Sequence, residues 1–101
     1  MLIYNITTRV DIVIADDWLA WQLNEHIPEI MSTDLFTDFK IYHLQDQDDS
    51  DGITYVIQFF TDAKIKYERY INDYANQLRE KAFKKWGNQF IAYRSLLKSV
   101  Q

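Results

Sequence analysis

The sequence predicts an α+β fold in which four strands and two helices follow one another in the order βαββαβ. Four segments are rich in β-branched and aromatic residues and alternate in polarity, which is typical of strands. Two longer segments, which follow the first and third of these, repeat apolar residues every three or four positions, as amphipathic helices do. A length of 101 residues suits one core, so we expect a single domain over residues 1–101.

The first strand is predicted at residues 2–10 and the first helix at residues 16–32, with Asp16 as its N-cap. Pro28 lies well inside the helical pattern. Because proline has no N–H to donate, we expect the helix to kink or restart there. The residues predicted to face the core from this helix are Leu19, Leu23, Ile27, Ile30 and Met31.

Trp18 and Trp21 fall on the opposite face of this projected helix, beside polar residues. Large indole rings are uncommon on a surface that contacts only water. The pair is therefore our candidate interaction surface for a partner.

The second strand is predicted at residues 35–45 and the third at residues 53–61, joined by an acidic turn that ends in Asp51-Gly52, a hairpin signal. The fourth strand is predicted at residues 89–98. These strands, like the first, carry apolar residues on alternate positions.

The second helix is predicted at residues 62–86, with Asp62 as its N-cap and Gly87 ending it. The residues of its predicted apolar stripe are Ala63, Tyr67, Tyr70, Ile71, Tyr74, Ala75, Leu78 and Ala82.

The economical fold for this order is ferredoxin-like, with a four-stranded antiparallel sheet in the order 4-1-3-2 and both helices on one face. The predicted strands nevertheless carry apolar residues on both faces. A monomer would leave about 600 Å² of apolar surface uncovered, which is large for a soluble monomer. We therefore predict a homodimer that packs sheet against sheet, the alternative being a monomer with scattered apolar surface residues.

The composition excludes several classes of protein. The chain has no cysteine, which excludes a disulfide scaffold and a thiolate metal site. The formal net charge of −4 argues against a nucleic-acid partner. No apolar run is long enough to cross a membrane, and nothing at the start of the chain resembles a signal peptide. We expect a cytoplasmic protein.

The net acidity is local, because four aspartates of the turn between the second and third strands account for it: Asp46, Asp48, Asp49 and Asp51. An EF-hand calcium loop is a poor match, since Asp51 and Ile57 stand where that loop needs glycine and glutamate. The two histidines, His26 and His43, lack the spacing of a metal motif. We expect a solvated turn and neither a metal nor a cofactor.

One group of residues is a candidate pocket: Asn5, His26, Gln58 and Arg94. The first, third and fourth are polar residues within otherwise apolar strands that are neighbours in the predicted sheet. If the strand parities align, these three side chains share one face and His26 approaches them from the first helix. His26 would then serve as a general base and Arg94 would bind an anion. The alternative is a buried network in which Arg94 pairs with a carboxylate and His26 bonds to the backbone.

Several strings in the chain resemble a small bacterial family of uncharacterised proteins, catalogued as domain of unknown function 4286. These strings are IYNIT, DDWLAWQLNEHIPEIMST, LFTDFKIY, DGITYVIQFF and WGNQFIAYRSLL. The resemblance covers nearly the whole chain and implies a ferredoxin-like domain with no assigned activity. The chain is more loosely similar to the dimeric α/β-barrel superfamily, which includes cofactor-independent monooxygenases.

Two functions remain open from the sequence. The first is a homodimeric, non-catalytic binding or interaction module that uses Trp18 and Trp21. The second is a cofactor-independent small-molecule enzyme, monooxygenase- or isomerase-like, with a pocket between the first helix and the sheet. A pocket into which His26 and Arg94 both open favours the enzyme, whereas a filled core with Arg94 paired to a carboxylate favours the module.

Overall fold

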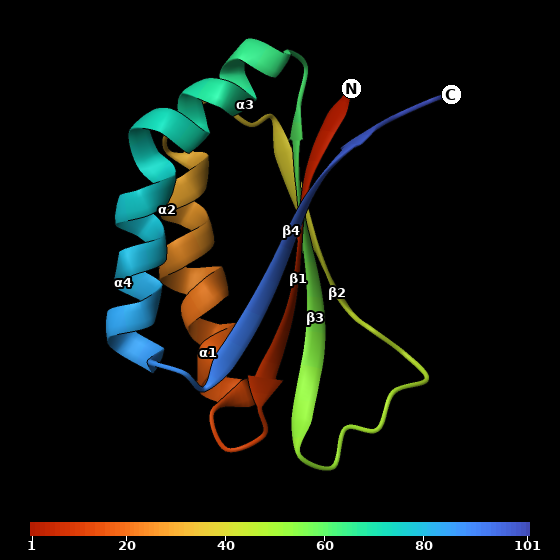
Figure 1. Cartoon of the computed structure of the whole chain (residues 1–101), viewed down its shortest axis with the longest axis vertical. Coiled ribbons are helices and arrows are strands. Elements are labelled where there is room, and N and C mark those ends of the chain that lie inside the picture. Colours follow the sequence, from red (N-terminus) through yellow and green to blue (C-terminus); the bar gives the residue numbers. More distant parts are fainter.

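A computed structural model describes all residues, 1–101. Its four strands are β1 (Leu2–Asp11), β2 (Asp38–His43), β3 (Gly52–Thr61) and β4 (Phe90–Lys98), and they form one antiparallel sheet in the order β2-β3-β1-β4. This order is the predicted ferredoxin-like order 4-1-3-2, counted from the opposite edge of the sheet. All helices lie on one side of it (Figure 1).

Each of the two predicted helices is interrupted by a π-helical turn. The first comprises α1 (Ala15–Trp21), η1 (Gln22–His26) and α2 (Ile27–Met31). The second comprises α3 (Lys64–Tyr70), η2 (Ile71–Ala75) and α4 (Asn76–Trp86). In the first helix the wide turn ends at His26, two residues before Pro28, which lies in the first turn of α2. The proline therefore restarts the helix through a π-helical turn, as its missing N–H leads one to expect.

The predicted N-caps Asp16 and Asp62 are wrong. The first helix begins one residue before Asp16, which lies in its first turn, where a carboxylate interacts favourably with the helix dipole. Ala63 is the extended N-cap residue of α3, and Asp62 instead pairs with Lys66 at 3.0 Å. The other end of the second helix is confirmed: Gly87 has φ +62° and donates its N–H to the Phe83 carbonyl at 2.7 Å.

The second strand is shorter than predicted because its first residues belong to a buried loop. Leu35 and Phe36 are buried in the core, although they precede β2. Asp34, at φ +61°, turns the chain out of α2 so that these two side chains reach beneath the helices. The apolar pattern was therefore a correct sign of burial but not of strand.

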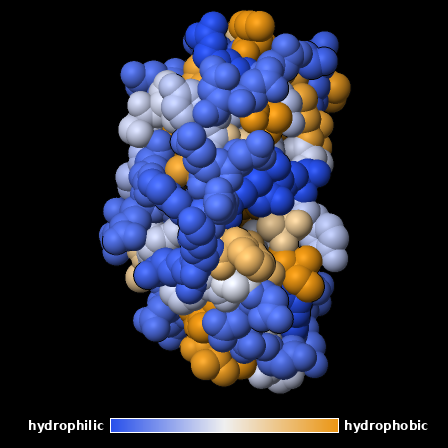
Figure 2. Space-filling view, turned by 60° about the vertical axis from the view of Figure 1, so that its left-hand side comes forward, coloured by the Kyte–Doolittle hydropathy of each residue, from blue (hydrophilic) through white to orange (hydrophobic).

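The core lies between the helices and one face of the sheet. The sheet contributes Tyr4, Val10, Tyr55, Ile57 and Phe59, all on the face toward the helices, which we call the inner face. The surface on the helix side is mainly hydrophilic, with hydrophobic atoms in separate patches (Figure 2). None of the helices is both long and apolar enough to cross a membrane.

Candidate functional site

A partly enclosed cavity of about 50 Å³ lies beneath the helices, against the inner face of the sheet. This volume holds only a few water molecules or a small ligand. Most of its wall is apolar, but four residues with strongly polar side chains also line it: Gln22, His26, Arg79 and Arg94. Polar groups that converge in an apolar hollow are the usual mark of a small-molecule site.

The strand register decides which predicted pocket residues meet. Arg94 pairs with Ile6 across β1 and β4, so it lies on the inner face and lines the cavity. Asn5 pairs with Gln58 and with Ser95, one position away from Ile6, and so lies on the opposite face of the sheet. The predicted group is therefore split: His26 and Arg94 come together, whereas Asn5 and Gln58 do not reach them.

The π-helical turn η1 places Gln22 and His26 at its two ends, and both line the cavity. The Oε1 atom of Gln22 and the Nδ1 atom of His26 are buried and have no hydrogen-bond partner within the protein. Native proteins satisfy nearly all buried polar atoms, so such orphan atoms need an explanation such as a bound molecule. π-helical turns are themselves frequent at functional sites.

The tryptophans do not form an exposed pair, so the predicted surface is wrong for Trp18. This side chain is only 1% exposed, stacks on Tyr55 at 5.4 Å between ring centroids, and forms part of the cavity wall. Trp21 is half-buried and stacks on His26 at 4.5 Å, with Trp86 edge-on at 5.9 Å. A π-helical turn adds a residue, so it rotates the two ends of a helix by about 100° relative to each other. A single 3.6-residue projection therefore misplaced the inward face of α1, and Leu23 is exposed.

Burial lowers the pKa of His26 from 6.5 to about 4. That value includes smaller contributions from charged neighbours: Glu29 raises the pKa, and Lys81 and Arg94 lower it. Desolvation disfavours the charged imidazolium, so the ring is neutral at neutral pH. The neutral imidazole of His26 carries one N–H donor and one acceptor nitrogen.

The two cavity arginines have no carboxylate partner. All ion pairs of the structure involve other basic residues, including a Lys81–Glu29 pair at 2.7 Å that joins α4 to α2. Arg79 donates through Nη2 to the hydroxyl of Tyr4 at 2.9 Å. Arg94 is exposed overall and also lines the cavity, which places it at the mouth. The buried, carboxylate-paired network that was the alternative to a pocket is not what the structure contains.

The sequence did not single out Gln22 or Arg79. A signal for Arg79 was present, because it follows Ala75 by four positions and precedes Ala82 by three, and both of these residues are buried. A base at that spacing on an apolar stripe faces inward. Gln22 follows Trp18 by four positions in the same way, but only the correct inward face of α1 would have shown it.

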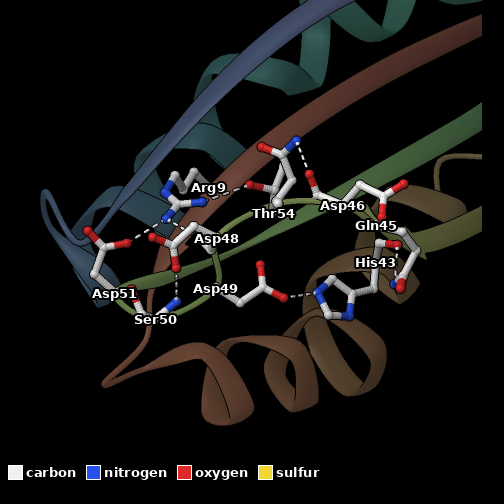
Figure 3. Close-up of polar contacts among 10 residues, drawn as sticks. Arg9, His43, Gln45, Asp46, Asp48, Asp49, Ser50, Asp51 and Thr54 are labelled. Carbon is white, nitrogen blue, oxygen red and sulfur yellow. Dashed lines mark hydrogen bonds and ion pairs between the residues drawn. The ribbon is translucent and has the colours of Figure 1, made fainter.

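The acidic turn between β2 and β3 forms a polar cluster with residues of the neighbouring strands (Figure 3). Arg9 donates to Asp51 Oδ1 at 2.6 Å and to the Asp48 carbonyl at 3.1 Å, and His43 pairs with Asp49 at 2.9 Å. These bonds tie the turn to β1 and β2. No group of three or more histidine and carboxylate side chains is arranged to hold a metal ion.

Comparison with known proteins identifies the family. A sequence profile described as "Domain of unknown function (DUF4286)" matches residues 1–100. The chain belongs to this family. No curated protein matches the DUF4286 chain.

Solved structures resemble the DUF4286 chain over nearly all of its length. A dimeric ferredoxin-like protein from an uncultured marine organism covers 99% of this chain and 96% of its own, at 12% identity and a TM-score of 0.64. An EthD family protein of Bacillus halodurans covers 99% of this chain and 100% of its own, at 13% identity and a TM-score of 0.67. A Bacillus cereus protein assigned as an antibiotic biosynthesis monooxygenase covers 99% and 95%, at 12% identity and a TM-score of 0.60. At these identities the likeness establishes the ferredoxin-like fold.

Proposed function

We propose that this protein binds a small anion, of the size of a short-chain carboxylate, in the cavity beneath its helices. The observation that carries the proposal is that two guanidinium groups, Arg79 and Arg94, line one largely apolar hollow with no carboxylate to neutralise them. An arginine near apolar walls gains most from an anion that accepts two parallel hydrogen bonds.

The other polar groups of the cavity suit such a ligand. A neutral imidazole has an N–H to donate, and His26 has an Nδ1 atom with no partner in the protein. Gln22 Oε1 is an orphan acceptor, which favours a ligand that also carries a donor, such as a hydroxy acid. The apolar wall from Ile6, Ile57 and Phe59 leaves room only for a short hydrocarbon part.

Catalysis is a second candidate, and the observation that favours it is the neutral imidazole beside Arg94. A general base works best when its pKa is near the working pH. With a pKa of about 4, His26 is a weak base toward most carbon acids. Binding is therefore the better-supported function, and an isomerase- or monooxygenase-like reaction is the alternative.

We also propose that the protein is a homodimer joined through the outer face of the sheet, the face away from the helices. Four large apolar side chains stand exposed there, with exposed fractions of 45% for Tyr42, 58% for Ile91, 69% for Tyr93 and 42% for Leu97. Soluble monomers rarely expose so many large apolar side chains on one face. The fold neighbour from a marine organism is described as dimeric. Equilibrium sedimentation that gives a monomer mass at micromolar concentration would contradict this.

Isothermal titration calorimetry tests the anion site, with propionate as the probe and propionamide as its uncharged isostere. We expect propionate to bind and propionamide not to bind. Arg94→Gln should weaken propionate binding about 10- to 100-fold, because a charged hydrogen-bond pair is lost. The matched control is Arg69→Gln, since Arg69 is exposed on α3 and forms no ion pair.

Equal affinity for propionate and propionamide would refute the anion site. An equal loss of propionate affinity in Arg94→Gln and Arg69→Gln would also refute it. Nuclear magnetic resonance spectra of bound propionate and lactate, recorded over hours, separate binding from catalysis. Unchanged ligands support a binding protein, and exchange of ligand protons with the solvent supports His26 as a base.

A further inference from the structure

A polar row crosses the outer face of the sheet between two apolar rows. The register aligns one residue from each strand in this row, in the spatial order Lys40, Gln58, Asn5 and Ser95. Two of them are carboxamides, and they lie on the two central strands β3 and β1.

The neighbouring rows on each side are largely apolar. One contains Phe60, Ile3 and Leu97, with Asp38 at its β2 end, and the other contains Tyr42, Val56 and Tyr93 on either side of Thr7. The amides are therefore surrounded on this face by the same apolar side chains that we expect a second copy to cover. When a second copy covers these apolar side chains, the polar atoms of the two amides lose their contact with water as well.

The two amides are already joined, but only part of their bonding capacity is used. Gln58 Nε2 donates to Asn5 Oδ1 at 3.2 Å, and the Asn5 amide nitrogen makes only a long contact of 3.5 Å to Thr7. A carboxamide offers two donors and an acceptor with two lone pairs. Gln58 Oε1 and the second N–H groups thus remain for a partner.

Position decides which partner groups these amides meet. Asn5 and Gln58 lie near the middle of β1 and β3, at the centre of the outer face. In a two-fold symmetric interface, residues near the axis meet their own copies. Like charges at that place would repel, whereas a carboxamide pairs with another carboxamide because it both donates and accepts.

We propose that the Asn5–Gln58 amide pair is the hydrogen-bonded centre of the homodimer and fixes the register in which the two sheets pack. This inference rests on the homodimer proposed above and assigns its specificity to two residues. Apolar contacts have no fixed direction, so the apolar rows alone would let one sheet pack on the other in several relative positions. A buried amide without a partner is costly, so only the offset that joins the two amide pairs leaves none unpaired.

The decisive variant is Gln58→Glu, which keeps the shape of the side chain and adds a charge. We expect the dimer dissociation constant, measured by analytical ultracentrifugation at neutral pH, to rise about 100-fold or more, because two carboxylates would meet at the axis. Gln77→Glu is the matched control, since Gln77 is exposed on α4, on the far side of the molecule, and its variant should dimerise normally.

The register itself is tested with Gln58→Leu, which should dimerise at least as tightly but without a single arrangement. The chain has no cysteine, so Arg69→Cys gives one spin-label site per protomer. Electron–electron distance measurements should give one narrow distribution in the parent and a broad or split one with Gln58→Leu.

The outcomes separate this inference from the proposed homodimer. A parent protein that stays monomeric overturns both. If the parent is a dimer that Tyr93→Asp dissociates while Gln58→Glu does not, the dimer stands and the central role of the amides is overturned. A single narrow distance with Gln58→Leu overturns the assignment of register to the amides.

Discussion

Replacement of His26 by glutamine should remove one acid-sensitive contribution to stability. The pKa of His26 is about 4 in the folded protein, against 6.5 for an exposed histidine, because the ring is desolvated. As the pH falls from 6.5 toward 4, His26 is protonated in the unfolded chain but stays largely neutral in the folded protein. The unfolded state therefore binds more protons, and the free energy of unfolding falls. At 1.36 kcal/mol per pKa unit the full shift corresponds to about 3.4 kcal/mol, and partial exposure of the ring reduces this to about 2–3 kcal/mol.

Urea unfolding at a fixed protein concentration between about pH 7 and pH 4 measures this contribution. The contribution is fully present above pH 6.5 and is lost progressively down to pH 4. The unfolding free energy of the wild type should therefore fall by about 2–3 kcal/mol more than that of His26→Gln. His43 is present in both proteins and cancels in the comparison. An unfolding free energy that falls equally with pH in the wild type and in His26→Gln would refute the burial of a neutral His26 in the cavity wall.

Three further expectations concern other parts of the molecule. Trp18→Ala should destabilise the protein by about 3–5 kcal/mol in urea unfolding, because this nearly fully buried ring is part of the core; a loss below about 1 kcal/mol would place the ring at the surface. Gly87→Ala should cost about 1–2 kcal/mol at its positive φ, although no neighbouring atom would touch the new methyl group; an unchanged melting temperature would contradict this backbone conformation. Millimolar calcium should leave the melting temperature unchanged, since the acidic turn lacks the ligands of a calcium loop; a rise would show that the turn binds the ion.

The sheet and its connections could be predicted from the sequence because strand residues report burial directly through alternation. The register that joins Arg94 to Ile6 could not, because a shift of one residue exchanges the two faces of a strand. The sequence shows which residues of one strand share a face, but it does not show which residues of neighbouring strands lie opposite each other. For this reason Asn5 and Gln58 were grouped with a pocket whose face they do not share.

The helical part of the site was less predictable for a different reason. Trp18 faces inward from α1, whereas Ile27 and Ile30 face inward from α2, and the π-helical turn between them, which begins at the buried Gln22, breaks the common period. Pro28 signalled an irregularity but not its kind. Arg79 was overlooked because a charged residue is normally assigned to solvent, although its helical spacing placed it on the buried stripe.

The most direct test of the anion site is the titration of His26 by nitrogen-15 nuclear magnetic resonance, with and without propionate. A carboxylate bound beside Arg94 and the imidazole favours the imidazolium, so the pKa of His26 should rise from about 4 by about one unit or more. Propionamide should have no such effect, and the signals of His43, which lies outside the cavity, should not move with either ligand. A His26 titration that propionate leaves unchanged would contradict the binding of small anions in this cavity.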